Sequence, residues 1–264
     1  SFNNFVGRFP EAVLVHKQLQ ILVLYFNKFN ESFPAGRSDW LNEAEQLHLG
    51  VNKFTGKFFE NSLEFMTSLT SIEVSINRLS GTLPESGLRK LLGLTSFYSQ
   101  TNQFSGSLPS TFGHSAPGLE SLMLSGNLHT GSLPESGLTR MLRLSLFALE
   151  ANRCQGTLPE LGFRSKSTMK ELRLLANGFF GSVSVHLLPG LTSIEQVYMQ
   201  QNHLSGSLPD RICRLGGLKI LWIGRNKFYG TLPVVGLRGL RKLGTSHIYE
   251  NQFAGRCAWG VRLT

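Results

Sequence analysis

Hydrophobic positions recur along this chain with a fixed period and in a fixed order around an asparagine. With that asparagine as position zero, apolar residues stand eight, five and three positions before it, as Leu69, Ile72 and Val74 do before Asn77. With the residues that follow, the unit is L-x-x-L-x-L-x-x-N-x-L-x-G-x-L-P. Its asparagines lie 24 or 25 residues apart, at positions 3, 27, 52, 77, 102, 127, 152, 177, 202, 226 and 251. This period indicates a solenoid of about ten to eleven repeats, a single domain over residues 1–264.

Each repeat is too short to bury a core of its own, so it must bury its apolar side against the neighbouring repeats. The alternation of Leu122 and Leu124 with outward residues predicts a short strand in each repeat. Strands of successive repeats should then pair into a parallel sheet. The three-residue spacing of Leu88, Leu91 and Leu94 predicts a 3₁₀ or short helical turn on the return segment.

The repeated asparagine is expected to point inward and to pair backbone groups that the turning chain leaves without partners. An amide side chain both donates and accepts hydrogen bonds, which suits this role. Stacked copies should form a ladder. The glycine four positions later permits a tight turn or a positive φ, and the proline at position seven fixes φ.

These motifs resemble the leucine-rich repeat, over essentially the whole chain. The G-x-L-P extension, as in Gly81-Thr82-Leu83-Pro84, is similar to the plant-type subclass found in receptor ectodomains and in inhibitors of cell-wall-degrading enzymes. The resemblance implies an α/β repeat solenoid, curved into a right-handed superhelix. Its parallel β-sheet would lie on the concave face, with short 3₁₀ or irregular return segments outside. This fold is a shared frame for display and does not by itself fix a function.

The ends of the chain depart from the regular pattern. Residues 1–10 already lie in mid-repeat, so we expect a fragment of a longer protein whose caps are missing or atypical. In the second repeat the outward positions Ile21, Val23 and Tyr25 are apolar, which predicts either a covered strand or a partner site. No apolar run approaches the roughly 20 residues of a membrane-spanning helix, so we expect only indirect contact with a membrane.

Charge is distributed unevenly along the chain. The net charge is +9, but residues 1–132 carry 9 Lys/Arg against 10 Asp/Glu, whereas residues 133–264 carry 17 against 7. The excess lies mainly on return segments, in the clusters Arg164/Lys166/Lys170, Arg211/Arg214/Lys219 and Arg238/Arg241/Lys242. A solvated face, an acidic protein partner or an anionic membrane surface would each suit this pattern. No nucleic-acid recognition motif accompanies it, so nucleic acid is not expected.

Neither cysteines nor histidines point to chemistry. Cys154 and Cys257 fall at inward positions and are expected in the core. Together with Cys213 they lie too many repeats apart to form an internal disulfide. No histidine has metal-ligand spacing to a second ligand, and no nucleophile, P-loop or dinucleotide motif occurs. We therefore expect no cofactor, no metal and no enzymatic activity, and the sequence leaves the compartment open.

The outward strand positions, four and two before each asparagine, form the predicted display surface. Tyrosine, tryptophan and arginine dominate binding hot spots and occur there or next to it. Together with one glutamine and one histidine they define the predicted partner-binding set: Tyr98, Arg173, Tyr198, Gln200, Trp222, Arg225, His247 and Tyr249. Two interpretations stay open. The rings pack laterally on the sheet, or they form a contact surface centred on Trp222.

Two functions follow from these features. The first is a non-enzymatic protein–protein interaction module, an architectural or accessory subunit of a multi-subunit complex. It would dock through its concave face and basic C-terminal half. The alternative is a ligand-recognising ectodomain of a plant-type receptor, or a secreted enzyme inhibitor. The protein partner is expected to be acidic or part of a larger assembly.

Overall fold

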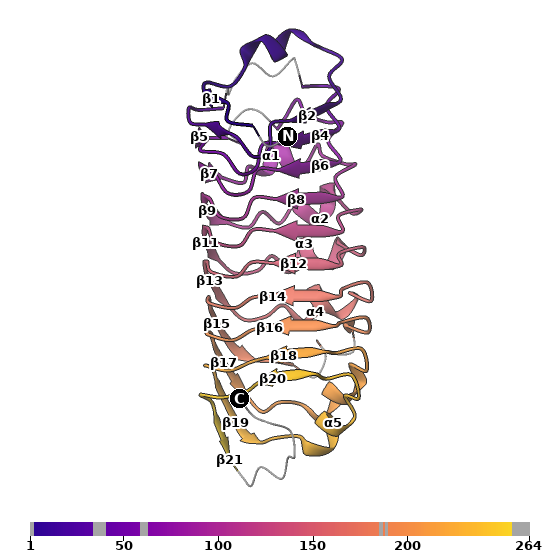
Figure 1. The fold of residues 1–264 in the computed structure, drawn as a ribbon. Helices are drawn as coiled ribbons and strands as arrows, with labels where there is room; N and C mark the ends of the chain where they lie inside the picture. Colours follow the sequence, from indigo (N-terminus) through magenta and orange to yellow (C-terminus); the bar gives the residue numbers. More distant parts are fainter. Residues whose placement is uncertain (1–2, 34–40, 59–62, 185–186, 188–189, 255–264) are drawn as a thin grey trace.

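The protein is a leucine-rich-repeat solenoid in which successive coils stack along one axis (Figure 1). The computed structural model describes residues 3–33, 41–58, 63–184, 187 and 190–254. The N-terminal coils lie at one end of the stack and the C-terminal coils at the other. Each coil contributes to parallel sheets and returns through an irregular or briefly helical segment, as the sequence predicts.

The first sheet contains the strands predicted from the alternating pattern. Strands that are adjacent in this sheet belong to successive coils. They pair in parallel and in register, so that equivalent residues lie opposite each other, as Leu47 lies opposite Ile72. The order is β2 (Ile21–Val23), β4 (Gln46–His48), β6 (Ser71–Glu73), β8 (Ser96–Tyr98), β10 (Ser121–Met123), β12 (Leu146–Ala148), β14 (Glu171–Arg173), β16 (Gln196–Tyr198), β18 (Ile220–Trp222) and β20 (Thr245–His247).

A second parallel sheet, which the sequence analysis did not predict, is built from the segments that follow each asparagine. The glycine expected to make a tight turn lies inside or at the end of these strands, with φ at +96° in Gly81. The order is β5 (Thr55–Lys57), β7 (Arg78–Thr82), β9 (Gln103–Ser107), β11 (Leu128–Gly131), β13 (Arg153–Gly156), β15 (Gly178–Ser182), β17 (His203–Gly206), β19 (Lys227–Thr231) and β21 (Gln252–Ala254). Strands β1 (Val6–Gly7) and β3 (Lys28–Phe29) form a separate pair.

The return segments carry short helices, and most of those described begin directly after the repeated proline. Pro84 precedes α1 (Glu85–Leu88). The acidic Glu85 lies in the first turn, where a negative charge stabilises the helix because the N-terminal end of the helix dipole is positive. The described helices are η1 (Glu11–Val15), α1, α2 (Phe112–Ser115), α3 (Glu135–Arg140), α4 (Glu160–Arg164), η3 (Asp210–Arg214) and α5 (Val234–Arg238). Both short α-helices and 3₁₀ helices occur, in agreement with the 3₁₀ or short helical turn predicted from the leucine spacing.

The asparagine ladder is present as predicted. Asn127 donates through Nδ2 to the carbonyl oxygens of Leu124 (3.1 Å) and Ser125 (3.2 Å) in its own coil and of Ser99 (3.0 Å) in the preceding coil. Its Oδ1 accepts from the backbone N–H of Phe104 at 3.0 Å. Equivalent bonds recur in every coil from Asn52 to Asn251. Each amide thus ties its own turn to the coil before it.

The residue directly before each ladder asparagine adopts the left-handed region, whatever its side chain. φ is +52° at Ile76 and +54° at Val51, although β-branched residues rarely occur there. In this conformation two successive N–H groups point at the next coil: Ile76 donates to Gln100 (2.8 Å) and Asn77 to Thr101 (3.1 Å). The strain, on the order of 1–3 kcal/mol per residue, is offset by these bonds.

Close contact between coils explains why the motif continues as glycine followed by serine or threonine. A Cβ placed on Gly106 would lie 3.0 Å from Cγ2 of Thr82, and one on Gly181 would lie 2.9 Å from Cγ2 of Thr157. Both glycines also have positive φ, +79° and +81°. The small side chain of one coil therefore covers the glycine of the next, and the second sheet requires both.

Several polar side chains occupy core rows that are otherwise apolar, and the two largest are His129 and Lys166. His129 stands among phenylalanines and leucines and is fully buried, and burial lowers its pKa to about 4. Lys166 was expected on the surface beside Arg164 and Lys170, but it too is fully buried, since it occupies the inward position held by Met141 in the preceding coil. No described group accepts a hydrogen bond from its Nζ, and burial lowers its pKa to about 8.

Loss of a ladder amide should destabilise the fold sharply. Asn127→Leu removes four hydrogen bonds and leaves three carbonyls and one N–H without that partner. With each unsatisfied buried group costing about 1–3 kcal/mol, we expect the free energy of unfolding in denaturant titrations to fall by at least about 3 kcal/mol. Asn152→Leu should behave alike. The exposed Gln103→Leu is the control, and an equal effect there would contradict the ladder's role.

Removal of the buried amine should stabilise the protein. The pKa of Lys166 is about 8 in the folded state against 10.5 ordinarily. Its charge therefore costs stability fully below pH 8, and the cost fades as pH rises to 10.5. We expect Lys166→Met to raise the free energy of unfolding by about 3 kcal/mol at pH 7 and by much less at pH 10. Lys170→Met, at an exposed lysine, should change neither value; a pH-independent gain for Lys166→Met would argue against this origin.

Candidate functional site

The outward face of the first sheet carries a continuous row of rings near its C-terminal end, here called the aromatic ridge (Tyr198, Trp222, His247 and Tyr249). Trp222 packs edge-on against Tyr198, with ring centroids 5.0 Å apart, and stacks on His247 at 4.3 Å with 10° between the ring planes. His247 in turn contacts Tyr249 at 5.9 Å. Strands β16, β18 and β20 bring these rings together because their registers align Tyr198, Trp222 and His247 directly.

Two arginines border the ridge, and each also pairs with carboxylates. The guanidinium of Arg173 lies 5.4 Å from the ring centre of Tyr198 and pairs with Glu171 at 2.5 Å. That of Arg225 lies 5.8 Å from the Tyr249 ring and pairs with Glu250 at 3.1 Å. These contacts hold the guanidinium groups over the rings, in cation–π geometry.

The structure brings most of the predicted set together. Arg173, Tyr198, Trp222, Arg225, His247 and Tyr249 form one contiguous surface with Gln200 beside it, whereas Tyr98 lies on β8, separated from β14 by two strands. The rings pack against one another as the first interpretation has it, and the contact surface of the second stays a prediction. They pack laterally, yet Trp222 remains partly exposed and Tyr249 is 43% exposed. Burial raises the pKa of Tyr198, and the buried Nε1 of Trp222 has no described hydrogen-bond partner.

A hollow of about 490 Å³ lies over the N-terminal part of the same face and is here called the N-terminal groove. The sequence analysis did not single it out. Its walls and floor come from β2, β4, β6, β8 and β10 and from the residues that follow them: Val23, Tyr25, His48, Glu73, Ser75, Tyr98, Gln100 and Met123. The volume is within the range of small-ligand sites. Of the predicted set, only Tyr98 contributes to it.

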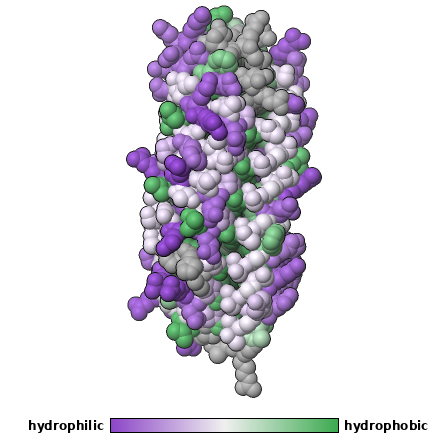
Figure 2. All heavy atoms as spheres, turned by 180° about the vertical axis from the view of Figure 1, so that it is seen from behind, coloured by the Kyte–Doolittle hydropathy of each residue, from purple (hydrophilic) through white to green (hydrophobic). Residues whose placement is uncertain are grey.

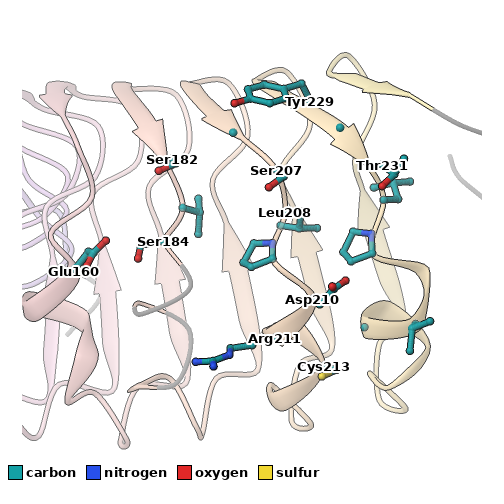
Figure 3. A pocket seen from close by; sticks show the side chains of 18 residues that line it. Glu160, Ser182, Ser184, Ser207, Leu208, Asp210, Arg211, Cys213, Tyr229 and Thr231 are labelled. Carbon is teal, nitrogen blue, oxygen red and sulfur yellow. The ribbon is translucent and has the colours of Figure 1, made fainter.

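A larger hollow, about 1470 Å³, lies on another side of the C-terminal half (Figure 3). Ser182 of the second sheet and Ser207, directly after β17, border it, and η3 adds Arg211 and Cys213. The described lining residues include no histidine, and the carboxylates of Glu160 and Asp210 line the same hollow.

The remaining surface offers no further constellation among the described residues. No group of three His, Cys, Asp or Glu side chains there could hold a metal ion, and none of the helices described is long and apolar enough to span a bilayer. Cys154 lies in the core as predicted, where burial raises the pKa of its thiol to about 12, and Cys213 is exposed. Cys257 lies outside the described residues. Viewed from behind, hydrophobic residues are scattered among hydrophilic ones (Figure 2).

Comparison with solved structures places this fold among plant receptor ectodomains. The plant peptide hormone receptor RGFR1, in complex with RGF2, superposes with a TM-score of 0.89 at 27% identity, over 95% of this chain and 39% of that one. A TDR receptor gives 0.85 at 28% identity, over 95% and 42%. The Arabidopsis receptor kinase HAESA ectodomain, in complex with an IDA peptide hormone ligand, gives 0.77 at 25% identity, over 96% and 45%.

The chain therefore spans less than half the length of these receptor chains. No protein-family model and no curated protein matches it. The likeness supports the plant-type repeat that the G-x-L-P motif indicates.

If the ridge is assembled in solution, its rings should be energetically coupled. We expect a double-mutant cycle of Trp222→Ala and His247→Ala, measured by denaturant unfolding, to give a coupling energy of about 0.5–1.5 kcal/mol, the value of a stacked pair. Trp222→Ala paired with Tyr98→Ala is the control, because the two rings lie on strands five apart in the sheet; that cycle should give no coupling. Coupling within error for the stacked pair would mean that the ridge is not pre-assembled.

Proposed function

We propose that this plant-type leucine-rich-repeat protein is a non-enzymatic recognition module that binds a peptide or an exposed protein segment along the outward face of its first sheet. The observation that carries the proposal is the aromatic ridge. Nothing in the repeat requires rings at these outward positions, yet four of them lie in contact across three adjacent coils. Large, partly exposed rings bordered by arginines are the usual composition of binding hot spots.

The ridge is also pre-organised. Trp222 is held between two rings, and Arg173 and Arg225 are each held by a carboxylate. A ligand would therefore order few side chains on binding, which lowers the entropic cost of association. Similar receptors bind peptide hormones, which supports a peptide as the ligand here.

An architectural or accessory subunit is the second candidate, favoured by the basic return segments. Arg164, Lys170, Arg211, Arg214 and Arg238 are exposed on the C-terminal half. They lie away from the ridge, so an acidic partner could dock there independently of any peptide. The two functions make different demands on the ridge, and substitution of its rings separates them.

Substitution of the ridge should abolish peptide recognition without unfolding the protein. We expect peptides selected from a displayed random library against the native chain to lose at least about 100-fold in affinity in the double variant Trp222→Ala/Tyr198→Ala, as two hot-spot residues would. The matched control is Phe180→Ala/Tyr229→Ala, which removes two rings exposed on the second sheet. Unchanged affinity in the ridge variant, or an equal loss in the control, would move recognition to another surface.

A further inference from the structure

We infer that the N-terminal groove is a separate subsite for a long basic side chain, arginine or lysine, of a peptide partner. Like the proposed function, the inference places a ligand on the outward face of the first sheet, but it concerns different residues and can stand or fall alone. It rests on the chemistry of the groove walls and of its floor.

The floor of the groove holds an incompletely satisfied carboxylate. Oε1 of Glu73 accepts hydrogen bonds from the backbone N–H and the hydroxyl of Ser75. Oε2 is shielded from solvent and accepts no hydrogen bond from the described residues. It lies against Gly50, where an added Cβ would be 1.9 Å from it. A buried oxygen without a donor is costly. Turned from Gly50 toward the groove that Glu73 lines, this oxygen would accept from a cationic donor, which would also compensate its charge.

A second acceptor lies beside the first. Oε1 of Gln100, on the row next to Glu73, is also buried without a described donor. The groove lining contains no lysine or arginine, and its one carboxylate is that of Glu73. An anionic ligand is therefore disfavoured, and a ligand with several N–H donors is favoured.

The walls suit the apolar stem of a basic side chain. Val23 and Tyr25 on one side are 43% and 37% exposed, and Tyr98 and Met123 line the other. Arginine and lysine bury their methylene stems against apolar surface and keep the charged head at a polar end. The tyrosine faces add cation–π attraction. Val23 and Tyr25 of the apolar second repeat are therefore exposed, and we explain this exposure by their position in one wall of the subsite.

The C-terminal part of the same face differs in composition. Arg173 and Arg225 border the aromatic ridge there and are paired with carboxylates, whereas the lining of the groove contains no lysine or arginine and one carboxylate, that of Glu73. A peptide lying along the face would place its basic residue over β6 and β8, where this carboxylate lies.

The test uses two probes that differ in charge and share a shape: N-acetyl-arginine amide and N-acetyl-citrulline amide. By isothermal titration calorimetry on the full chain we expect the arginine probe to bind at least tenfold more tightly. Glu73→Gln should reduce the ratio to within twofold. Tyr98→Leu, which keeps the carboxylate, should weaken the arginine probe at least threefold. The exposed Glu120→Gln is the charge control and should retain the full preference.

Three results would overturn the inference: equal affinity for the two probes, a preference that survives Glu73→Gln, or no binding of the arginine probe at millimolar concentration. The ridge variant Trp222→Ala/Tyr198→Ala should leave arginine-probe binding unchanged. Peptide binding lost in that variant while the probe still binds would show two separable subsites. Probe binding without any effect of the ridge on peptides would support the groove and remove the proposed function.

Discussion

The whole solenoid depends on the side-chain amide of one residue per coil. A turn that closes every 24 or 25 residues leaves backbone carbonyls and N–H groups facing an apolar interior, where unpaired groups are costly. Each asparagine from Asn52 to Asn251 satisfies three carbonyls and one N–H, as Asn127 does at 3.0 to 3.2 Å. Because one carbonyl and the N–H belong to the preceding coil, the same bonds that close a turn also attach it to its neighbour. The period, the stacking and the two sheets follow from this coupling.

The ladder also accounts for the strained residue before each asparagine. Val51 and Ile76 tolerate positive φ because the conformation aims consecutive N–H groups at the next coil. Strain of this kind persists only where the surroundings over-determine it. Here the surroundings are the same in every coil, so the conformation recurs with valine, isoleucine, threonine and arginine alike. Local preference is overridden by a repeated tertiary contact.

The sequence predicted what depends on periodicity and missed what depends on contacts between specific coils. The inward leucines, the first sheet and the ladder follow from spacing alone. The second sheet does not, because it forms only when the serine or threonine of one coil covers the glycine of the next, as Thr82 does at Gly106. The burial of Lys166 could have been predicted, because its position in the repeat is inward. The expectation of a surface position relied on its charge and was wrong. The N-terminal groove was not predicted because its lining combines the two outward rows, four and two positions before each asparagine, across five strands.

These constraints decide where function can reside. The inward residues must be apolar to fill the core, and the asparagine is needed for the ladder. The residue before the asparagine must adopt positive φ, and the glycine must leave room for the side chain of the adjacent coil. The outward positions of the first sheet are free of all four requirements. The residues that occupy them nevertheless form two organised regions, with coupled rings and arginines on β16, β18 and β20 and an acceptor-lined groove on β2 to β10. Organisation where the fold demands none is the physical reason to assign recognition to this face.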